Sequence, residues 1–405
     1  MANQFDYDVI IAGGGPAGSS AAIHLTMAGA RVLLVEQKKF PRPKLCGEFI
    51  SPECAPHFER LGVAEQMLAA SPARLTETVF YSRQQRSVSV PSAWFGANGV
   101  ALGLSRAEMD ERLLRRASDA GAVVLEEAQV VNLLFDNDRV AGVTIKHTGK
   151  HTGYRAPVTI DATGRARALA RRVDQSHHKT KSHRASLVAF KAHLEDARVA
   201  PGVCEIYFYR GGYGGLSSIE NGLSNLCFIA SARAVRECGT DAERVMREVV
   251  CQNGRAAYAL EHARASTPWL AVSLEGFGRH TVTPTTGLLA IGDAASFIDP
   301  FTGSGMLMAL ESGELAASVI GDRIAAIRRG AGILELETLY RAAYKTRFHS
   351  RLRICSLMRR AAFVPGLAQL AIRVFGRSDH LRHRLSRATR GSSPETYRLP
   401  GRLNG

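Results

Sequence analysis

Residues 7–18 read YDVIIAGGGPAG and join an apolar strand to a helix through three consecutive glycines. The β-branched run Val9 to Ala12 predicts a buried parallel strand. The small residues that follow predict a helix over 19–28, which Gly29 ends. Residues 30–35 form a second apolar run that ends at Glu36. Strand, glycine turn, helix, strand and acid in this order predict an α/β protein of the Rossmann type.

The same stretch predicts a dinucleotide site. Gly13 permits the tight turn, Gly15 lets the backbone approach a pyrophosphate, and Gly18 lets the helix pack closely on the strand. The free N–H groups at the start of the helix attract the pyrophosphate. Glu36 stands 18 residues after Gly18, where it can accept hydrogen bonds from an adenosine ribose.

The rest of the chain continues this domain and interrupts it. A helix is predicted over 105–120 with Ser105 as its N-cap, and a long helix over about 305–325. Between 184 and 274, short strands alternate with Gly-rich turns and one helix near 241–251, which predicts an antiparallel sheet. We therefore expect three parts, with the following ranges: a discontinuous nucleotide-binding domain of 1–73, 101–183 and 276–330; a substrate domain of 74–100 and 184–275; a basic helical region, 331–405.

Composition and charge limit the class of protein. The net charge is +15, but the 15 Lys+Arg and two acids after residue 340 leave only +2 for the first 340 residues. The basic tail lacks a nucleic-acid reading motif, so we expect no nucleic-acid partner. Seven scattered Cys without a CxxC pair favour a reducing compartment. No signal peptide or spanning run is evident, so we expect a cytoplasmic protein, or one at the inner face of the membrane.

Taken together, the segments resemble the FAD-dependent oxidoreductases of the p-hydroxybenzoate hydroxylase fold, and most of all the geranylgeranyl reductase family. The similarity covers roughly residues 5–330. Besides the first glycine loop, it rests on the segments LSRAEMD (104–110), Gly292-Asp293 and DPFTGSG (299–305). It implies non-covalent FAD held by Gly13, Gly15, Pro16, Ala17, Gly18, Glu36, Gln37, Cys46, Gly47, Arg106, Val130, Gly164, Gly292, Asp293, Pro300, Gly303, Ser304 and Gly305.

The resemblance also suggests a catalytic residue and shows departures. Cys46 in Lys44-Leu45-Cys46-Gly47-Glu48 matches a family segment near the flavin, where a thiol could tune the flavin or contact substrate. The alternative is a small packing residue. Thr163-Gly164 stands where relatives often have Asp-Gly, and residues 213–218 (YGGLSS) lack the aromatic and Pro of many reductases. We expect no metal site, because the His clusters lack acid or Cys partners.

Three functions remain open. The first is a reductase that uses FAD to reduce carbon-carbon double bonds of an isoprenoid or other lipophilic substrate. No second GxGxxG occurs, so NADPH or NADH would dock only transiently. The second is an FAD monooxygenase or halogenase acting on an aromatic or polyketide-like substrate, since one fold hosts several chemistries. The third is a non-catalytic FAD- or lipid-binding protein. The basic C-terminal helices would either lie on an anionic membrane or form a packed cap.

Overall fold

The computed structural model describes residues 5–95, 99–177, 187–275, 277–299, 303–329, 331–362 and 383. Five of the described strands form a sheet in the order β20-β12-β1-β2-β8, and every pairing is parallel. Their bounds are β1 Val9–Ala12, β2 Val32–Val35, β8 Val123–Leu125, β12 Val158–Asp161 and β20 Leu288–Ala290. The Rossmann-type fold predicted from residues 7–36 is confirmed.

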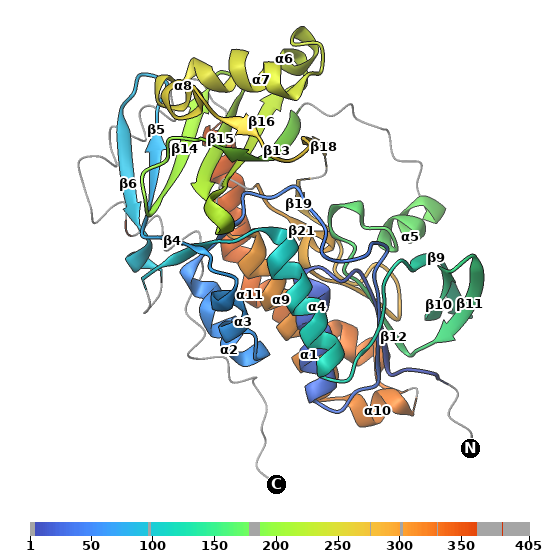
Figure 1. Cartoon of the computed structure of the whole chain (residues 1–405). Helices are drawn as coiled ribbons and strands as arrows, with labels where there is room; N and C mark the ends of the chain where they lie inside the picture. The colour runs from blue at the N-terminus through green and yellow to red at the C-terminus, as the bar shows by residue number, and fades with distance from the viewer. Residues whose placement is uncertain are drawn as a thin grey trace.

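The parallel sheet lies between two layers (Figure 1). Helices α1 (Pro16–Met27), α4 (Arg106–Asp119) and α9 (Gly305–Gly321) cover the face that carries Ile11 and Leu34. The opposite face carries Ile10 and Leu33 and packs on a three-stranded antiparallel sheet, made of β9 (Gln129–Asp136), β10 (Arg139–His147) and β11 (Lys150–Arg155). Because both faces are covered, β1, β2, β8 and β20 are apolar at every position rather than at alternate ones, and only β12 of the five strands carries polar residues, Thr159 and Asp161.

A second, eight-stranded sheet stands apart from this domain, at the top of Figure 1. We call it the substrate sheet; its strands are β5 (Glu77–Tyr81), β6 (Ser87–Pro91), β13 (Leu187–Glu195), β14 (Val203–Tyr209), β15 (Gly212–Ser218), β16 (Ser224–Ser231), β17 (Arg264–Ala265) and β18 (Leu270–Leu274). Its neighbours are antiparallel, as expected, except that β14 and β5 are parallel. The chain leaves the nucleotide-binding domain before β5 and returns to it after β6 to form α4, so β5 and β6 belong to the substrate sheet.

Helices α6 (Ala232–Glu237), α7 (Ala242–Glu248) and α8 (Gly254–Leu260) cover one face of the substrate sheet. One helix near 241–251 was expected, and there are three. Side chains of Ser231, Asp241 and Asn253 each accept hydrogen bonds from backbone N–H groups of the following helix. Three N-caps therefore start three short helices where the sequence pattern suggested one.

Strand β15 lies in the middle of the substrate sheet, although its sequence, GYGGLSS, resembles a turn. The glycines allow neighbouring strands to approach. A Cβ atom on Gly212 would lie 1.9 Å from the carbonyl oxygen of Ile229. Glycine inside a strand often marks such a close backbone approach.

The remaining described elements connect the two sheets or cover the helices. They are β3 Phe49–Ile50, β4 Ala73–Leu75, β7 Ala101–Gly103, β19 Gly278–Arg279, β21 Ser296–Phe297, α2 Ala55–Leu61, α3 Ala64–Ala69, α5 Ala170–His177 and α10 Ile324–Arg328. The helix expected over 305–325 is interrupted after Gly321, and α10 follows it. None of the helices in the described part of the chain combines the length and the apolar composition that crossing a membrane requires.

The C-terminal helix α11 (Ile333–Ala362) packs on α9. Tyr340 and Phe348 on its inner side are fully buried in the same core as α1 and α9. Glu311 of α9 pairs with Arg347 and Arg351 of α11 at 2.7 and 2.5 Å. From 333 to about 355 the apolar side of this basic helix is thus a packed cap. The rest of the basic helical region expected over 331–405 lies outside the described residues, apart from residue 383.

Replacing Gly212 by Ala is expected to destabilise the protein by about 2 kcal/mol, because the added methyl group must displace a backbone carbonyl. Gly153→Ala in β11 is the matched control, since its Cβ would meet only the Leu134 side chain, at 3.4 Å. Urea denaturation of both variants measures the free energy of unfolding. Equal midpoints for the two variants would contradict the close packing of β15.

Candidate FAD and substrate site

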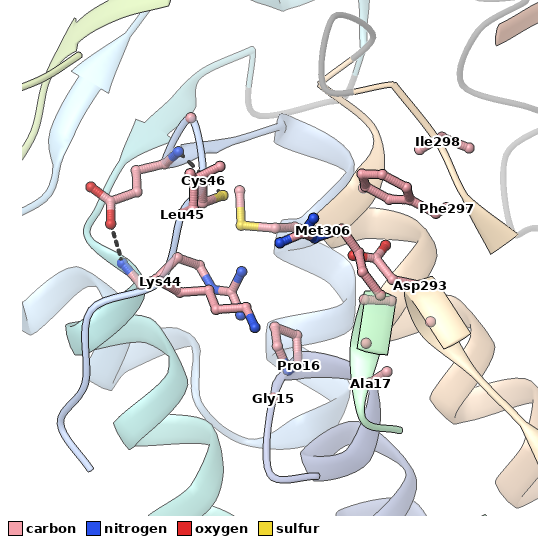
Figure 2. Close-up of a pocket in the computed structure, with 18 of the residues that line it drawn as sticks. Gly15, Pro16, Ala17, Lys44, Leu45, Cys46, Asp293, Phe297, Ile298 and Met306 are labelled. Carbon is pink, nitrogen blue, oxygen red and sulfur yellow. Dashed lines mark hydrogen bonds between the residues drawn. The ribbon is translucent and has the colours of Figure 1, made fainter. Parts of the chain in front are cut away.

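A single cavity of about 1100 Å³ extends from the glycine loop after β1 to the substrate sheet. Ligand pockets usually measure roughly 300–1,000 Å³, so this cavity has room for more than one drug-sized molecule. Figure 2 shows Lys44 and Cys46 facing Asp293 and Phe297 across it, with Gly15 at the start of α1. Its two ends differ in chemistry, and each is described in turn.

The glycine loop has the shape that a pyrophosphate needs. Gly13 has a φ of +107°, and a Cβ on Gly18 would lie 1.9 Å from the Gly13 carbonyl oxygen. These two glycines therefore let α1 approach β1. Gly15 differs, because its Cβ would point into the cavity, 3.9 Å from the Arg106 guanidinium. Gly15 is also the N-cap of α1 and offers no side chain to the first N–H groups, which stay available to an anion.

Glu36 lies at the end of β2 and lines the cavity. Its carboxylate accepts hydrogen bonds from the backbone N–H groups of Gly14 at 2.8 Å and Lys38 at 2.9 Å. Each carboxylate oxygen retains a second lone pair, so the side chain can brace the glycine loop and still accept from a ribose hydroxyl. The bracing contact was not anticipated from the sequence.

Four cations surround the loop: Arg42, Lys44, Arg106 and Arg165 all line the cavity. Arg106 forms a bidentate ion pair with Asp110 of α4, at 2.7 Å for both hydrogen bonds. Burial, and then the charges of the three arginines, lower the pKa of Lys44. Such mutual repulsion costs free energy in the protein alone, and a bound anion would relieve it.

Asp293 follows β20 and is the carboxylate that acts on both Lys44 and Arg165. Burial raises the pKa of the Asp293 carboxyl, while the charges of Lys44, Arg106 and Arg165 act in the opposite direction. Asp110 pairs with Arg106 and Glu36 lies 3.6 Å from Arg42, so Asp293 is the carboxylate left to act on Lys44 and Arg165, and this end of the cavity keeps a net positive charge. The glycine loop, the cations and Glu36 together fit the pyrophosphate and ribose of FAD.

Glu48 forms a buried ion cluster that the sequence did not reveal. Its carboxylate is fully buried and lies 2.5 Å from the Lys191 ammonium and 2.7 Å from Nε2 of His193, both on β13. It also accepts a hydrogen bond from the backbone N–H of Arg106 at 2.8 Å. Burial alone would raise the pKa of Glu48, but the hydrogen bond from His193 and the charge of Lys191 outweigh it and lower the pKa.

Cys46 lines the cavity directly before this cluster. Its sulfur accepts a hydrogen bond from the Glu48 N–H at 3.4 Å and interacts with the Arg106 guanidinium. Asn225 of β16 donates to the Cys46 carbonyl at 3.2 Å. The thiol is therefore held at the point where the nucleotide end of the cavity meets the substrate sheet.

The described site residues predicted from the sequence fall into two groups. Most line the cavity: Gly13, Gly15, Pro16, Ala17, Glu36, Gln37, Cys46, Gly47, Arg106, Val130, Gly164, Gly292, Asp293, Gly303 and Gly305. Gly18 and Ser304 lie behind the wall, Gly18 against Gly13 and Ser304 fully buried at the start of α9. Pro300 lies outside the described residues.

Sequence reasoning missed Arg42, Arg165, Lys191 and His193. For the last two a signal existed. Residues 187–194 read LVAFKAHL, and the basic residues stand two apart, on one face of an otherwise apolar strand. Two charges on one face of a buried strand predict a counter-charge from another element. Nothing in the sequence pointed to Glu48 as that counter-charge.

Gly15→Ala is expected to fold as stably as the wild type and to bind FAD at least about tenfold more weakly, because its methyl group enters the cavity at the helix start. Gly18→Ala is the contrasting variant: its methyl group would meet the Gly13 carbonyl, so the apoprotein itself should lose stability. Flavin fluorescence titration and urea denaturation separate the two effects. A Gly15→Ala variant with wild-type FAD affinity would contradict the assignment of this loop as the pyrophosphate-binding loop.

Glu48→Gln removes the counter-charge of a buried ammonium and should destabilise the protein by about 3–5 kcal/mol at pH 7. Lys191→Met in the same chain should recover part of this loss. The folded pKa of Glu48 lies below its ordinary value of 4.5. The stabilisation that the charge of Glu48 gives to the folded protein is therefore complete above pH 4.5 and is lost as the pH falls through the folded pKa.

The measurement is urea denaturation of the wild type and Glu48→Gln between pH 7 and pH 3. The difference in unfolding free energy should shrink at acid pH, where the wild-type carboxylate becomes protonated. A difference that stays constant over this range would show that the charge of Glu48 is unimportant.

The chain resembles known proteins in sequence and in fold. A family model described as FAD binding domain matches residues 6–334. The chain is 27% identical over 340 residues to a menaquinone reductase of Mycolicibacterium smegmatis, covering 77% of this chain and 76% of that protein. It is also 27% identical over 330 residues to a digeranylgeranylglycerophospholipid reductase of Methanocella arvoryzae, covering 79% of each chain.

Among solved structures, that of the flavin-dependent brominase Bmp2 superposes with a TM-score of 0.76 at 20% sequence identity, covering 95% of this chain and 93% of that chain. This likeness concerns the fold. Since the family model spans most of the sequence and its glycine loop opens onto a cavity suited to a dinucleotide, the chain belongs to the FAD binding domain family and is an FAD-dependent oxidoreductase.

Proposed function

We propose that this protein is a reductase that uses FAD to saturate carbon-carbon double bonds of an isoprenoid or a similarly lipophilic substrate. When bound and reduced by a donor such as NADPH or NADH, FAD would supply the hydride that such a reduction requires, and a proton completes the addition to the double bond. The observation that carries the proposal is the composition of the second end of the cavity. There the substrate sheet and its neighbours contribute mainly apolar side chains, among them Phe49, Phe80, Val88, Val90, Phe95, Ile206 and Phe208.

This wall suits a hydrocarbon better than a polar aromatic substrate. Thr78, Tyr213 and Ser217 add hydroxyl groups to it, and the described strands of the substrate sheet bring no charged side chain to the cavity surface. Burying a hydrocarbon chain there is favourable by roughly 25 cal/mol per Å² of apolar surface removed from water. Both aligned relatives are named as reductases, and one of them by an isoprenoid lipid, which supports the same substrate class.

The chain's own part in the reaction is to hold the cofactor and to orient the substrate beside it. The cations at the glycine loop fix the cofactor's charged end, and the apolar wall excludes water from the reacting double bond. Cys46 lies between these two ends, so we propose it as the residue that contacts substrate or tunes the flavin. NADPH or NADH would reduce the cofactor from a transient docking position.

We also propose a cytoplasmic enzyme that visits the inner face of the membrane. In support, Leu334 and Leu357 at the two ends of α11 are 69% and 68% exposed, and the sequence after residue 340 is strongly basic. The packed inner side of α11 leaves these leucines free to contact a membrane, and the basic composition of the sequence after residue 340 would add attraction to anionic lipid.

The test is anaerobic turnover of the FAD-loaded enzyme with dithionite or NADPH and an isoprenoid alcohol, followed by mass spectrometry. A reductase adds two hydrogen atoms per double bond and works without air.

Ile206→Trp should block the apolar end and lower kcat/KM at least about tenfold without changing FAD affinity, whereas Ile206→Leu, of equal volume, should keep activity. Turnover that requires oxygen and yields a hydroxylated or halogenated product would replace the proposal with an oxygen-dependent reaction.

A further inference from the structure

A groove of about 580 Å³ lies beside the cavity, between α11 and β19. It is lined by Arg279, Ser350, Arg353, Ile354, Ser356 and Leu357. Leu357 also lines the large cavity, so the groove and the cavity meet at this exposed side chain. Apart from Leu357, the residues that line the groove do not line the cavity.

The groove gathers positive charge from two elements far apart in the sequence. The Arg279 guanidinium of β19 lies 2.9 Å from Nδ1 of His349 on α11. Burial, and then the charges of Arg279, Arg353 and Lys345, lower the pKa of His349, and two of these cations, Arg279 and Arg353, line the groove. A neutral His349 accepts the hydrogen bond from Arg279 and so orients the guanidinium.

These cations differ from the other arginines of α11. Arg347 and Arg351 face inward and pair with Glu311, and Arg359 lies 3.3 Å from Asp299. Within the described part of the chain, no carboxylate forms an ion pair with Arg279, Lys345 or Arg353. The other three arginines of α11 just named differ, because a carboxylate lies close to each of them. Among the described residues, the groove therefore has positive charge that no carboxylate neutralises, with Arg279 held by the imidazole of His349, and the hydroxyls of Ser350 and Ser356 add further donors.

We infer that this groove binds the phosphate-bearing head group of a lipid whose hydrocarbon chain lies in the apolar end of the cavity. The inference rests on the proposed function, since it assigns a second part of the same substrate. Arginine suits this role because its planar guanidinium donates two parallel hydrogen bonds to a phosphate. Leu357 would contact the first carbons of the chain at the junction. A concave groove joined to the cavity favours a single head group over a flat anionic membrane.

The test compares two probes with the same chain on the FAD-loaded enzyme: geranylgeranyl diphosphate and geranylgeraniol. Binding is followed by perturbation of the oxidised flavin spectrum, which needs no turnover. The double variant Arg279→Gln/Arg353→Gln should bind the diphosphate about tenfold more weakly or worse, as expected for lost hydrogen bonds to a charged group. Its affinity for the alcohol should stay unchanged. Inorganic pyrophosphate should compete with the diphosphate and not with the alcohol.

Arg233→Gln/Arg264→Gln is the matched control, because it removes two arginines that are 84% and 75% exposed outside the groove. It should bind both probes as the wild type does. Equal loss of affinity in both double variants would reduce the effect to net charge and overturn the inference. The inference would also be overturned if Arg279→Gln/Arg353→Gln bound both probes as the wild type does. This holds even if that variant lost its attachment to phosphatidylglycerol vesicles.

The two proposals can fail separately. If neither isoprenoid perturbs the flavin spectrum, the proposed isoprenoid substrate is wrong. Calorimetry with inorganic pyrophosphate on the FAD-loaded enzyme then decides the inference alone. Binding that the groove variant loses and the control keeps supports an anion site in the groove, and absence of binding by the wild type overturns it.

Discussion

The buried carboxylate of Glu48 joins three parts of the molecule that the chain brings together from distant positions. It belongs to the loop that carries Cys46, it accepts a hydrogen bond from the first turn of α4, and it neutralises Lys191 on the substrate sheet. An ammonium buried without its counter-charge is costly, so these three parts must keep their relative positions. The cavity lies between them, and its shape depends on this cluster.

The nucleotide-binding half of the fold was predictable because its signals are local. A β-branched run, three glycines and an acid within 36 residues specify a strand, a tight turn and a helix whose packing allows little variation. The substrate sheet was harder, because pairing between strands depends on contacts distant in sequence. The glycines of β15 gave the signal of a turn, and only the approach of Ile229 shows why a strand requires them.

The candidate site shows the same contrast between residues with a local sequence signal and residues that only the tertiary fold brings together. Residues that contact a cofactor through the backbone, such as Gly15, carry a sequence signature, since few residue types can replace them. Side chains that act through charge carry little signature. Arg42 and Arg165 resemble any surface arginine in the sequence, and their meaning comes from lining one cavity and acting with Arg106 on the charge of Lys44. Their positions follow from the tertiary fold rather than from local spacing.

The free energy of this arrangement links cofactor and substrate. Cations crowded at the glycine loop repel one another until a pyrophosphate arrives, so cofactor binding should stabilise the folded protein by more than its contacts alone. The apolar wall beyond Cys46 works through a different force, the removal of hydrocarbon from water. Because a fold of this kind also serves a brominase, the choice of reaction must lie in that wall and in what it admits to the flavin. Under the proposed function, a long hydrocarbon held against the cofactor would keep water and polar reactants away, and these conditions favour transfer of a hydride to a double bond.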